Sequence, residues 1–287
     1  MQTFLPYASF EESARCLDSL RLGKQRVEVL QILRASMLED YGWQTHPVVC
    51  MWRGHEDALI AYGLAISDEW IRRGHRDTCL AQIAEFSTHR RPPTERELIE
   101  RGAMPPWLGD EALHRSHRSA LLRKHRDHYA PFFERDLPDD LPYVWPVPCA
   151  APDTAREPIA AWVLRAETRA MLGRFVRDGV VALPDADAHS GTKSARMTRA
   201  FVEDAKIGDV ILVPDEARLL VGEITSDARH ERRRRRPHVR DVRWLGELDR
   251  RALRRPVRLQ DPSLFFALRG EDDPRLAMTA SASSARV

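Results

Sequence analysis

The sequence has few cysteines, and none of them is placed as a metal ligand. Cys16, Cys50, Cys79 and Cys149 lie far apart, with no Cys-x-x-Cys pair and no Cys/His ligand spacing. This absence excludes the common zinc modules and predicts four free thiols in a reducing cytosol. We therefore expect a cytoplasmic protein that uses no metal and no other cofactor.

The sequence also lacks long apolar runs and a strong charge of one sign. No stretch reaches the roughly 20 apolar residues of a membrane helix, and Met1-Gln2-Thr3-Phe4 does not begin a signal peptide. We expect no membrane partner. The formal net charge is only +2, from 45 basic and 43 acidic residues. Because such a sum can conceal basic stripes, the distribution of charge must decide about nucleic acid.

The length of 287 residues, 43% of them hydrophobic, suits two domains. A dense group of prolines separates two stretches that differ in their pattern of apolar residues. These prolines are Pro138, Pro142, Pro146, Pro148, Pro152 and Pro158. Prolines at this density prevent regular structure and are typical of a linker. The predicted division is a helical domain at 1–146, a linker at 147–158, a β-rich domain at 159–269 and a disordered tail at 270–287.

Apolar residues recur at helical spacing through most of the first half. Helices are predicted at 11–38, 46–73, 77–88, 95–101 and 110–127, and Gly74 is placed to end the second. The second half alternates short β-type runs with polar turns. Strands are predicted at 162–164, 180–183, 209–213, 219–224 and 239–245, with short helices at 168–177 and 194–205. The fold class is multidomain, α and α+β, the second domain being a small β-barrel with helical insertions.

Two groups of polar residues in the first half could bind nucleic acid. Arg21, Lys24, Gln25 and Glu28 follow helical spacing and share one face. The helix at 110–127 carries many basic residues, of which Arg115, Arg118 and Lys124, together with Tyr129, are candidates for phosphate and base contacts. The alternative for each group is a solvated helix face. His46 is a candidate for a base pocket or a helix cap, and Trp43, Trp52, Trp70 and Trp107 are expected in the core.

A series of short motifs in the first half resembles a known family in order and spacing. The motifs are Arg21-Leu22-Gly23-Lys24-Gln25-Arg26-Val27-Glu28, His46-Pro47, Arg53-Gly54-His55, Trp70-Ile71-Arg72-Arg73-Gly74, Arg118-Ser119 and His128-Tyr129. Over about residues 1–146 they resemble the pyrimidine-dimer DNA glycosylases of the phage endonuclease V type. The resemblance implies a helical domain that kinks DNA, displaces a nucleotide and attacks the sugar C1′ with an amine.

The resemblance implies an amine, a carboxylate and phosphate-binding arginines in this chain. An α-amine suits the attack because its reference pKa of about 7.7–8.0 leaves part of it neutral. The family exposes the amine of a small second residue, whereas the large Gln2 predicts that Met1 is retained and supplies it. Leu22 follows Arg21 where the family has a glutamate, so Glu28 is the substitute carboxylate. Arg26 matches a phosphate-binding arginine. Lys24, placed among arginines, is an alternative Schiff-base amine.

The second half resembles the PUA-like domains of the EVE group over about residues 158–269. The motifs include Ala161-Trp162-Val163-Leu164, Lys206-Ile207-Gly208-Asp209-Val210 and His238-Val239-Arg240-Asp241-Val242-Arg243-Trp244-Leu245. The resemblance implies a pocket for a flipped, modified base. Trp162 and Trp244 are the candidate rings of this pocket, or else barrel core. The run that includes Arg233, Arg234 and Arg235 is a candidate phosphate-binding loop.

The two resemblances together predict a DNA glycosylase with abasic-site lyase activity. Its partner would be double-stranded DNA with damaged or modified bases, and its role DNA repair or defence against modified phage DNA, alongside a nuclease or repair protein. Two alternatives remain open. One is a non-catalytic protein that binds modified DNA and recruits a nuclease, and the other is an RNA-binding or RNA-modification protein.

Overall fold

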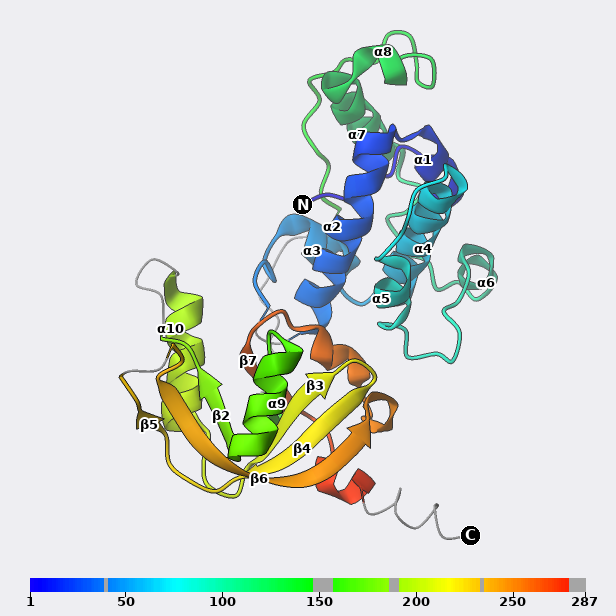
Figure 1. Cartoon of the computed structure of the whole chain (residues 1–287). Coiled ribbons are helices and arrows are strands. Elements are labelled where there is room, and N and C mark those ends of the chain that lie inside the picture. The colour runs from blue at the N-terminus through cyan, green and yellow to red at the C-terminus, as the bar shows by residue number, and fades with distance from the viewer. Residues whose placement is uncertain (39–40, 147–156, 186–190, 233–234, 279–287) are drawn as a thin grey trace. The chain divides into compact units, whose positions relative to one another are not determined.

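The computed structural model describes residues 1–38, 41–146, 157–185, 191–232 and 235–278. The chain divides into two compact units, Met1–Thr154 and Ala155–Val287, and each is described by itself. The first unit is helical, and the second is built around a mixed β-sheet with helical insertions (Figure 1). The predicted fold class is therefore confirmed. Most of the predicted linker, and residues 279–287 of the predicted tail, lie outside the described residues.

The helices of the first unit differ from the predicted ones mainly in where they are interrupted. They are α1 (Phe10–Cys16), α2 (Ser19–Met37), α3 (Pro47–Trp52), α4 (Glu56–Arg72), α5 (Leu80–Ala84), α6 (Glu95–Glu100), α7 (Glu111–Lys124) and α8 (Arg126–Tyr129).

The predicted helix at 11–38 is two helices, because Leu17 is extended and Asp18 begins α2 as its N-cap. The Asp18 carboxylate accepts a hydrogen bond from the Arg21 amide, which fixes the start of the helix. The predicted helix at 46–73 is also interrupted. Gly54, with φ +82°, takes the left-handed conformation between α3 and α4. Gly74 ends the second stretch as predicted, at φ +86° just after α4.

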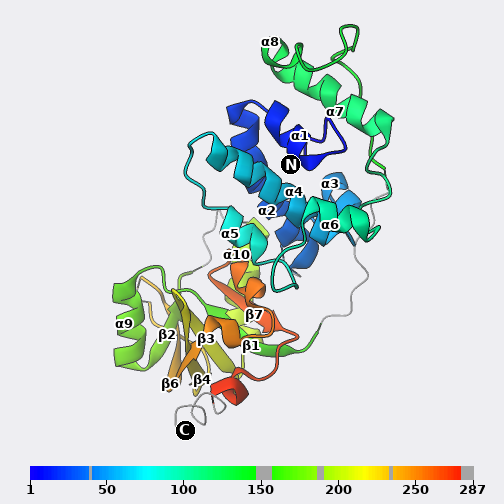
Figure 2. The same cartoon turned by 90° about the vertical axis from the view of Figure 1, so that its right-hand side faces the viewer.

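The helices α2 and α4 run side by side and form the centre of the first unit (Figures 1 and 2). Their close approach depends on Gly63 of α4, where an added Cβ would lie 2.6 Å from Cγ1 of Val29 in α2. The predicted apolar face of α2 is only partly correct. Leu20 and Val27, which recur at helical spacing with Leu30, Leu33 and Met37 and so mark the apolar face expected from the sequence, are exposed, whereas Leu22, Val29 and Ile32 are fully buried.

Among its described residues the second unit contains seven strands, with two α-helices between them. The strands are β1 (Ile159–Leu164), β2 (Val180–Leu183), β3 (Val210–Asp215), β4 (Arg218–Ile224), β5 (Arg229–His230), β6 (His238–Asp249) and β7 (Phe265–Arg269). The helices are α9 (Arg169–Asp178) and α10 (Gly191–Arg199), with a π-helical turn at Ala200–Asp204 and 3₁₀ turns at Arg250–Ala252 and Pro256–Gln260.

The seven strands form one sheet in the order β2-β6-β4-β3-β1-β7, with β5 also paired to β6. Only β1 and β3 run parallel; the other pairs are antiparallel. Since β2 and β7 stand at the two ends of this order, the sheet is a curled half-barrel rather than a closed barrel. A break in register between Val221 and Gly222 falls where β4 pairs with the long strand β6.

Apolar side chains cover both faces of the sheet. One face packs on α9 and on Phe201, while the other packs on Leu253, which follows the first 3₁₀ turn, and on Leu259 of the second. The prediction of a disordered tail from residue 270 is wrong for residues 274–278, which are helical. Ala277 and Met278 pack against the second face, so burial of apolar surface orders this part of the chain.

The expectation of four free thiols is also wrong. Cys50 is disulfide-bonded, whereas Cys16 and Cys79 are free and buried. Sequence spacing could not reveal this, because pairing depends on which cysteines the tertiary structure brings together. Across the ranges that the structure describes, every helix is too short or too polar to cross a bilayer.

Candidate functional site

The first six residues run extended through the interior of the first unit, and side chains rather than a neighbouring strand satisfy their backbone. Gln25 of α2 makes two of these contacts. Its Oε1 accepts from the Phe4 amide at 2.8 Å, and its Nε2 donates to the Gln2 carbonyl at 2.9 Å. Because Gln25 is itself buried, these bonds are shielded from water and hold the chain start against α2.

Side chains of helices α3, α4 and α7 also form hydrogen bonds with this segment. The Leu5 amide donates to Nδ1 of His117 at 2.9 Å, and Nδ1 of His114 lies 2.8 Å from the Leu5 carbonyl oxygen. The hydroxyl of Tyr62 donates to the Phe4 carbonyl at 2.9 Å, and the indole of Trp52 donates to the Thr3 hydroxyl at 2.9 Å. The amino-terminal segment is thus fixed by three helices in addition to α2.

Glu28 lies at the end of this segment and is buried. Its Oε2 accepts from the Gln2 amide at 3.3 Å and from Nε2 of Gln25 at 2.8 Å. Its Oε1 lies 3.6 Å from Nζ of Lys24, whose side chain is 72% exposed. The structure therefore brings Lys24, Gln25 and Glu28 together as predicted from helical spacing. The alternative of a solvated face does not hold for Gln25 and Glu28, because the amino-terminal segment covers them.

The charges of the Met1 α-amine and of Glu28 both act on His46. Partial burial lowers the pKa of the His46 imidazole, the positive α-amine lowers it further, and the negative Glu28 opposes the shift. His46 is also the N-cap of α3, its Nδ1 accepting from the Val48 amide at 3.2 Å, so the predicted cap is confirmed. Met1 is half-buried. The amine and the carboxylate are thus both close enough to His46, at a partly exposed place, to influence its pKa.

Trp43 lies beside this place and is 67% exposed. Its ring packs edge-on against His46, with centroids 5.9 Å apart. Its backbone has φ +72°, which is uncommon for a bulky residue and marks local strain. The expectation that Trp43 is a core residue is therefore wrong, whereas Trp52 and Trp107 are buried as expected.

Arg21 and Arg26, two of the three arginines of α2, are engaged by acidic side chains. Nη1 of Arg21 lies 3.1 Å from Oδ2 of Asp18, and its Nη2 donates to the Lys124 carbonyl. Arg26 pairs with Asp77 and lies 4.2 Å over the ring of Trp70. Lys24 is therefore not embedded among free arginines, and its ionic partner is Glu28.

The basic helix α7 divides into buried and exposed candidates. Arg118 is buried and binds the Pro6 carbonyl, Glu111 and Glu134, so it supports the fold. Tyr129 is fully buried, and its hydroxyl donates to Asp18 at 2.7 Å, which excludes the predicted stacking on a base. Arg115 and Lys124 are exposed, and Nζ of Lys124 lies 5.8 Å from the Phe4 ring. These two remain candidates for phosphate contacts.

The predicted base pocket of the second unit is filled by core. Trp162 is buried and stacks on Phe265 with centroids 4.9 Å apart, and its indole donates to Asp209 at 2.9 Å. Trp244 packs against the same core cluster and donates to the Phe175 carbonyl at 3.1 Å. Neither ring is offered to a ligand in this structure. Arg235 is exposed, while Arg233 and Arg234 lie outside the described residues.

Several residues of the amino-terminal site were not singled out from the sequence. Tyr62, His114 and His117 contact the chain start from α4 and α7, and burial lowers the pKa of His117 to about 3. Their positions on helices gave no sign of this role, because a buried imidazole and a basic helix face have the same sequence pattern. The one signal in the sequence was that apolar residues lie at helical spacing on either side of His117, although the run around it is otherwise basic.

Comparison with known proteins bears on both units. No curated protein matches the chain. Residues 177–259 match a family model described as Domain of unknown function (DUF8426). Residues 1–83, which include the chain start, α2, His46 and Tyr62, match the family model described as Pyrimidine dimer DNA glycosylase. The amino-terminal region is therefore similar to a pyrimidine dimer DNA glycosylase domain, and the function of the carboxyl-terminal domain is unknown.

Proposed function

We propose that the first unit is a DNA glycosylase with abasic-site lyase activity, acting on a pyrimidine lesion in duplex DNA. The α-amine of Met1 is the nucleophile, and Glu28 is the carboxylate that moves protons and stabilises positive charge at the sugar. The observation that carries the proposal is the bond between the Gln2 amide and Glu28, which fixes the residue next to Met1 beside that carboxylate. The match of residues 1–83 supplies the substrate class.

The reaction follows from an amine and a carboxylate placed together. The nitrogen lone pair of the amine bonds to C1′ while the C1′–N bond to the base breaks and its electron pair leaves with the base. A proton reaches the departing base, and the amine loses a proton as the sugar ring opens to an imine. Removal of a proton from C2′ then breaks the C3′–O bond and releases the 3′ phosphate. Glu28 lies where it can carry these protons.

Burial of Glu28 suits this role. A carboxylate shielded from water interacts more strongly with developing positive charge than an exposed one does. Two hydrogen bonds, from Gln2 and from Gln25, fix its orientation before substrate binds. Lys24, exposed beside it, is placed to bind a phosphate, with Lys124 and Arg115 as further candidates for phosphate contacts.

Trp43 is the proposed stacking residue. An exposed indole on a strained backbone, in contact with His46, can occupy the space left by a displaced nucleotide or stack on the base. Loss of base stacking costs a few kcal/mol, and a large ring can offset it. Trp43 was expected in the core from the sequence, and the proposal assigns it to the DNA-binding site instead.

For the second unit we propose the role of a reader of modified bases, with the basic loop before β6 binding phosphate. The resemblance to the EVE group and the curled sheet support this role. Since Trp162 and Trp244 are engaged in the core, a base would have to be read elsewhere on the unit. Arg235→Ala should then weaken binding to modified and unmodified duplexes equally and reduce its salt dependence.

Borohydride trapping tests the glycosylase proposal. The full chain is incubated with duplexes containing a pyrimidine dimer, an abasic site or no lesion, reduced, digested and analysed by mass spectrometry. We expect a covalent adduct on the amino-terminal peptide with the first two duplexes. Lys24→Ala should retain the adduct, while acetylation of the α-amine should abolish it.

Three outcomes would count against this proposal. An adduct on Lys24 would move the nucleophile to that residue. An adduct with the abasic duplex but no cleavage of a glycosidic bond at the dimer would leave a lyase without glycosylase activity. Binding to lesion duplexes without any adduct would favour a non-catalytic protein that recognises modified DNA.

A further inference from the structure

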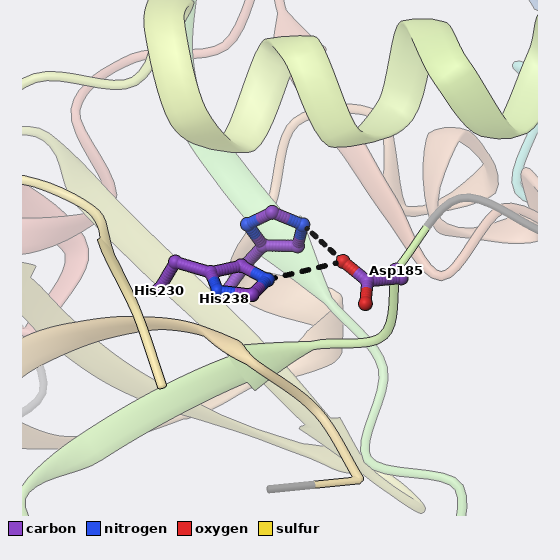
Figure 3. A group of neighbouring side chains, drawn as sticks. All are labelled: Asp185, His230 and His238. Atoms are coloured by element: carbon purple, nitrogen blue, oxygen red, sulfur yellow. Dashed lines mark ion pairs between the residues drawn. The ribbon is translucent and has the colours of Figure 1, made fainter. Parts of the chain in front are cut away.

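Two histidines and an aspartate converge at one end of the sheet in the second unit (Figure 3). His238 is the first residue of β6, His230 is the last of β5, and Asp185 follows β2 by two residues. Their ligand atoms all lie within 4.8 Å of one another. The three residues come from three separate segments, so the sequence showed no ligand spacing.

The strand register brings the two histidines together. In β6, His238 pairs with Leu183 of β2 and with His230 of β5. Residues directly opposite each other across neighbouring strands share a face of the sheet. Asp185 stands two positions beyond Leu183, past the end of β2, and its carboxylate is directed toward both imidazoles (Figure 3). The segment that follows β2 therefore adds the aspartate to the histidine pair.

The distances fit a shared cation. Oδ1 of Asp185 lies 2.9 Å from Nε2 of His238 and 3.5 Å from Nε2 of His230. Zinc ligands bonded at about 2.0–2.2 Å in a tetrahedron lie about 3.3–3.6 Å apart, so only small side-chain movements separate this cluster from a coordination shell. His238 is mostly buried, while His230 and Asp185 are exposed, which leaves an approach for an ion from solvent.

Two neighbouring cations are already paired with carboxylates outside the cluster. Arg229, which precedes His230, binds Glu231 and Asp241, and Arg236 binds Glu167. Both cations are thus neutralised by carboxylates of their own. Asp185 remains to balance a bound cation, and the two imidazoles supply neutral nitrogen donors.

We propose that Asp185, His230 and His238 form a binding site for a divalent transition-metal ion of the zinc type. Imidazole nitrogen together with one carboxylate selects zinc, nickel, cobalt or copper over magnesium and calcium, which prefer oxygen ligands. Three protein ligands leave at least one coordination position for water or for an anionic oxygen. This site is separate from the amino-terminal site and does not depend on its proposed chemistry.

Isothermal titration of the full chain, tag-free and stripped with chelator, tests the site with Zn²⁺. We expect one site per chain, and at least about tenfold weaker binding after His230→Ala, His238→Ala or Asp185→Ala. His89→Ala is the matched control, because His89 bonds Asp57 at 3.0 Å as a single histidine–carboxylate pair in the first unit. The control should bind Zn²⁺ as the parent does.

Cobalt(II) absorption gives an independent readout. We expect weak visible bands of nitrogen and oxygen coordination that disappear in His230→Ala. This variant changes an exposed residue of a two-residue strand and should leave the fold intact even if His238→Ala does not fold. Unchanged Zn²⁺ affinity in the His230 variant would overturn the proposal. So would a thiolate charge-transfer band, which would place the ion on a cysteine.

Discussion

The amide nitrogen of Gln2 lies 3.3 Å from Oε2 of Glu28, although 26 positions separate the two residues in the chain. This bond, with the two that Gln25 makes to residues 2 and 4, holds the second residue of the chain beside a buried carboxylate. A free chain terminus would ordinarily fray into solvent. Here the terminus is ordered by side chains of α2, α3, α4 and α7, and its position is what permits the proposed amine chemistry.

Glu28→Gln is expected to lower the rate of base release by about 10²–10⁴-fold, the range in which proton transfer by a positioned side chain contributes. Glutamine keeps an oxygen that can accept from the Gln2 amide, so the terminus should stay in place. Single-turnover cleavage of the glycosidic bond in a dimer duplex, detected as strand scission at the resulting abasic site after alkali treatment, measures the effect. Glu100→Gln, which changes an exposed partner of Arg96 on α6, is the control. A Glu28 variant as fast as the parent would remove this carboxylate from the reaction.

Trp43→Ala is expected to weaken binding to a lesion duplex by about tenfold or more, because stacking on a base contributes about 1–3 kcal/mol. The free energy of unfolding should change little, since the ring is largely exposed. Phe132→Ala removes another exposed ring, 47% exposed, away from His46 and should leave affinity unchanged. Fluorescence anisotropy measures the affinity of each variant for the lesion duplex. Equal losses in the two variants would indicate a general effect of surface aromatics rather than a role for Trp43.

Tyr62→Phe is expected to destabilise the first unit by about 1–3 kcal/mol, because the buried Phe4 carbonyl and Gln25 both lose a partner. Slower adduct formation should accompany this loss, as the amino-terminal segment is held less firmly. The matched substitution Tyr7→Phe removes an exposed hydroxyl bond to the Phe132 carbonyl and should cost much less. Denaturant unfolding and trapping rates provide the comparison. Equal losses of stability and of trapping rate in the two tyrosine variants would show that the ordering of the amino terminus does not depend on Tyr62.

The stability of the first unit should fall as pH drops below about 6.5. Burial, and to a lesser degree His114, lowers the pKa of His117 to about 3, so the folded imidazole stays neutral while the unfolded chain takes up a proton. The loss accumulates between about pH 6.5 and pH 3, then levels off, with an upper limit of roughly 5 kcal/mol.

His117→Asn tests this dependence, because asparagine can still accept from the Leu5 amide but does not titrate. The slope of unfolding free energy against pH between 4 and 6.5 should flatten in this variant. His89→Asn, at an exposed histidine, should keep the parental slope. A His117 variant with the parental slope would assign the pH dependence to other groups.

Much of the helical unit was predictable because helix signals are local. Gly74 ends α4 as its position suggested, and His46 caps α3. The break at Gly54 and the start of α2 at Asp18 were missed, since apolar spacing runs through both points. The β-rich character of the second unit followed from strand periodicity, but a barrel was expected where the structure has a half-barrel. The strand order could not be predicted, because periodicity carries no information on which strands pair.

The sequence alone determined that a helical unit precedes a β unit, and that Lys24, Gln25 and Glu28 share one face of a helix. These properties depend on periodicity along a few turns or strands, which the chain carries locally. The tertiary structure decided which of those polar side chains are buried, where the first residue lies, and that Trp162 and Tyr129 serve the core. It also joined Asp185, His230 and His238. Such outcomes depend on contacts between distant segments, and hydrophobic packing and strand pairing, rather than local spacing, select those contacts.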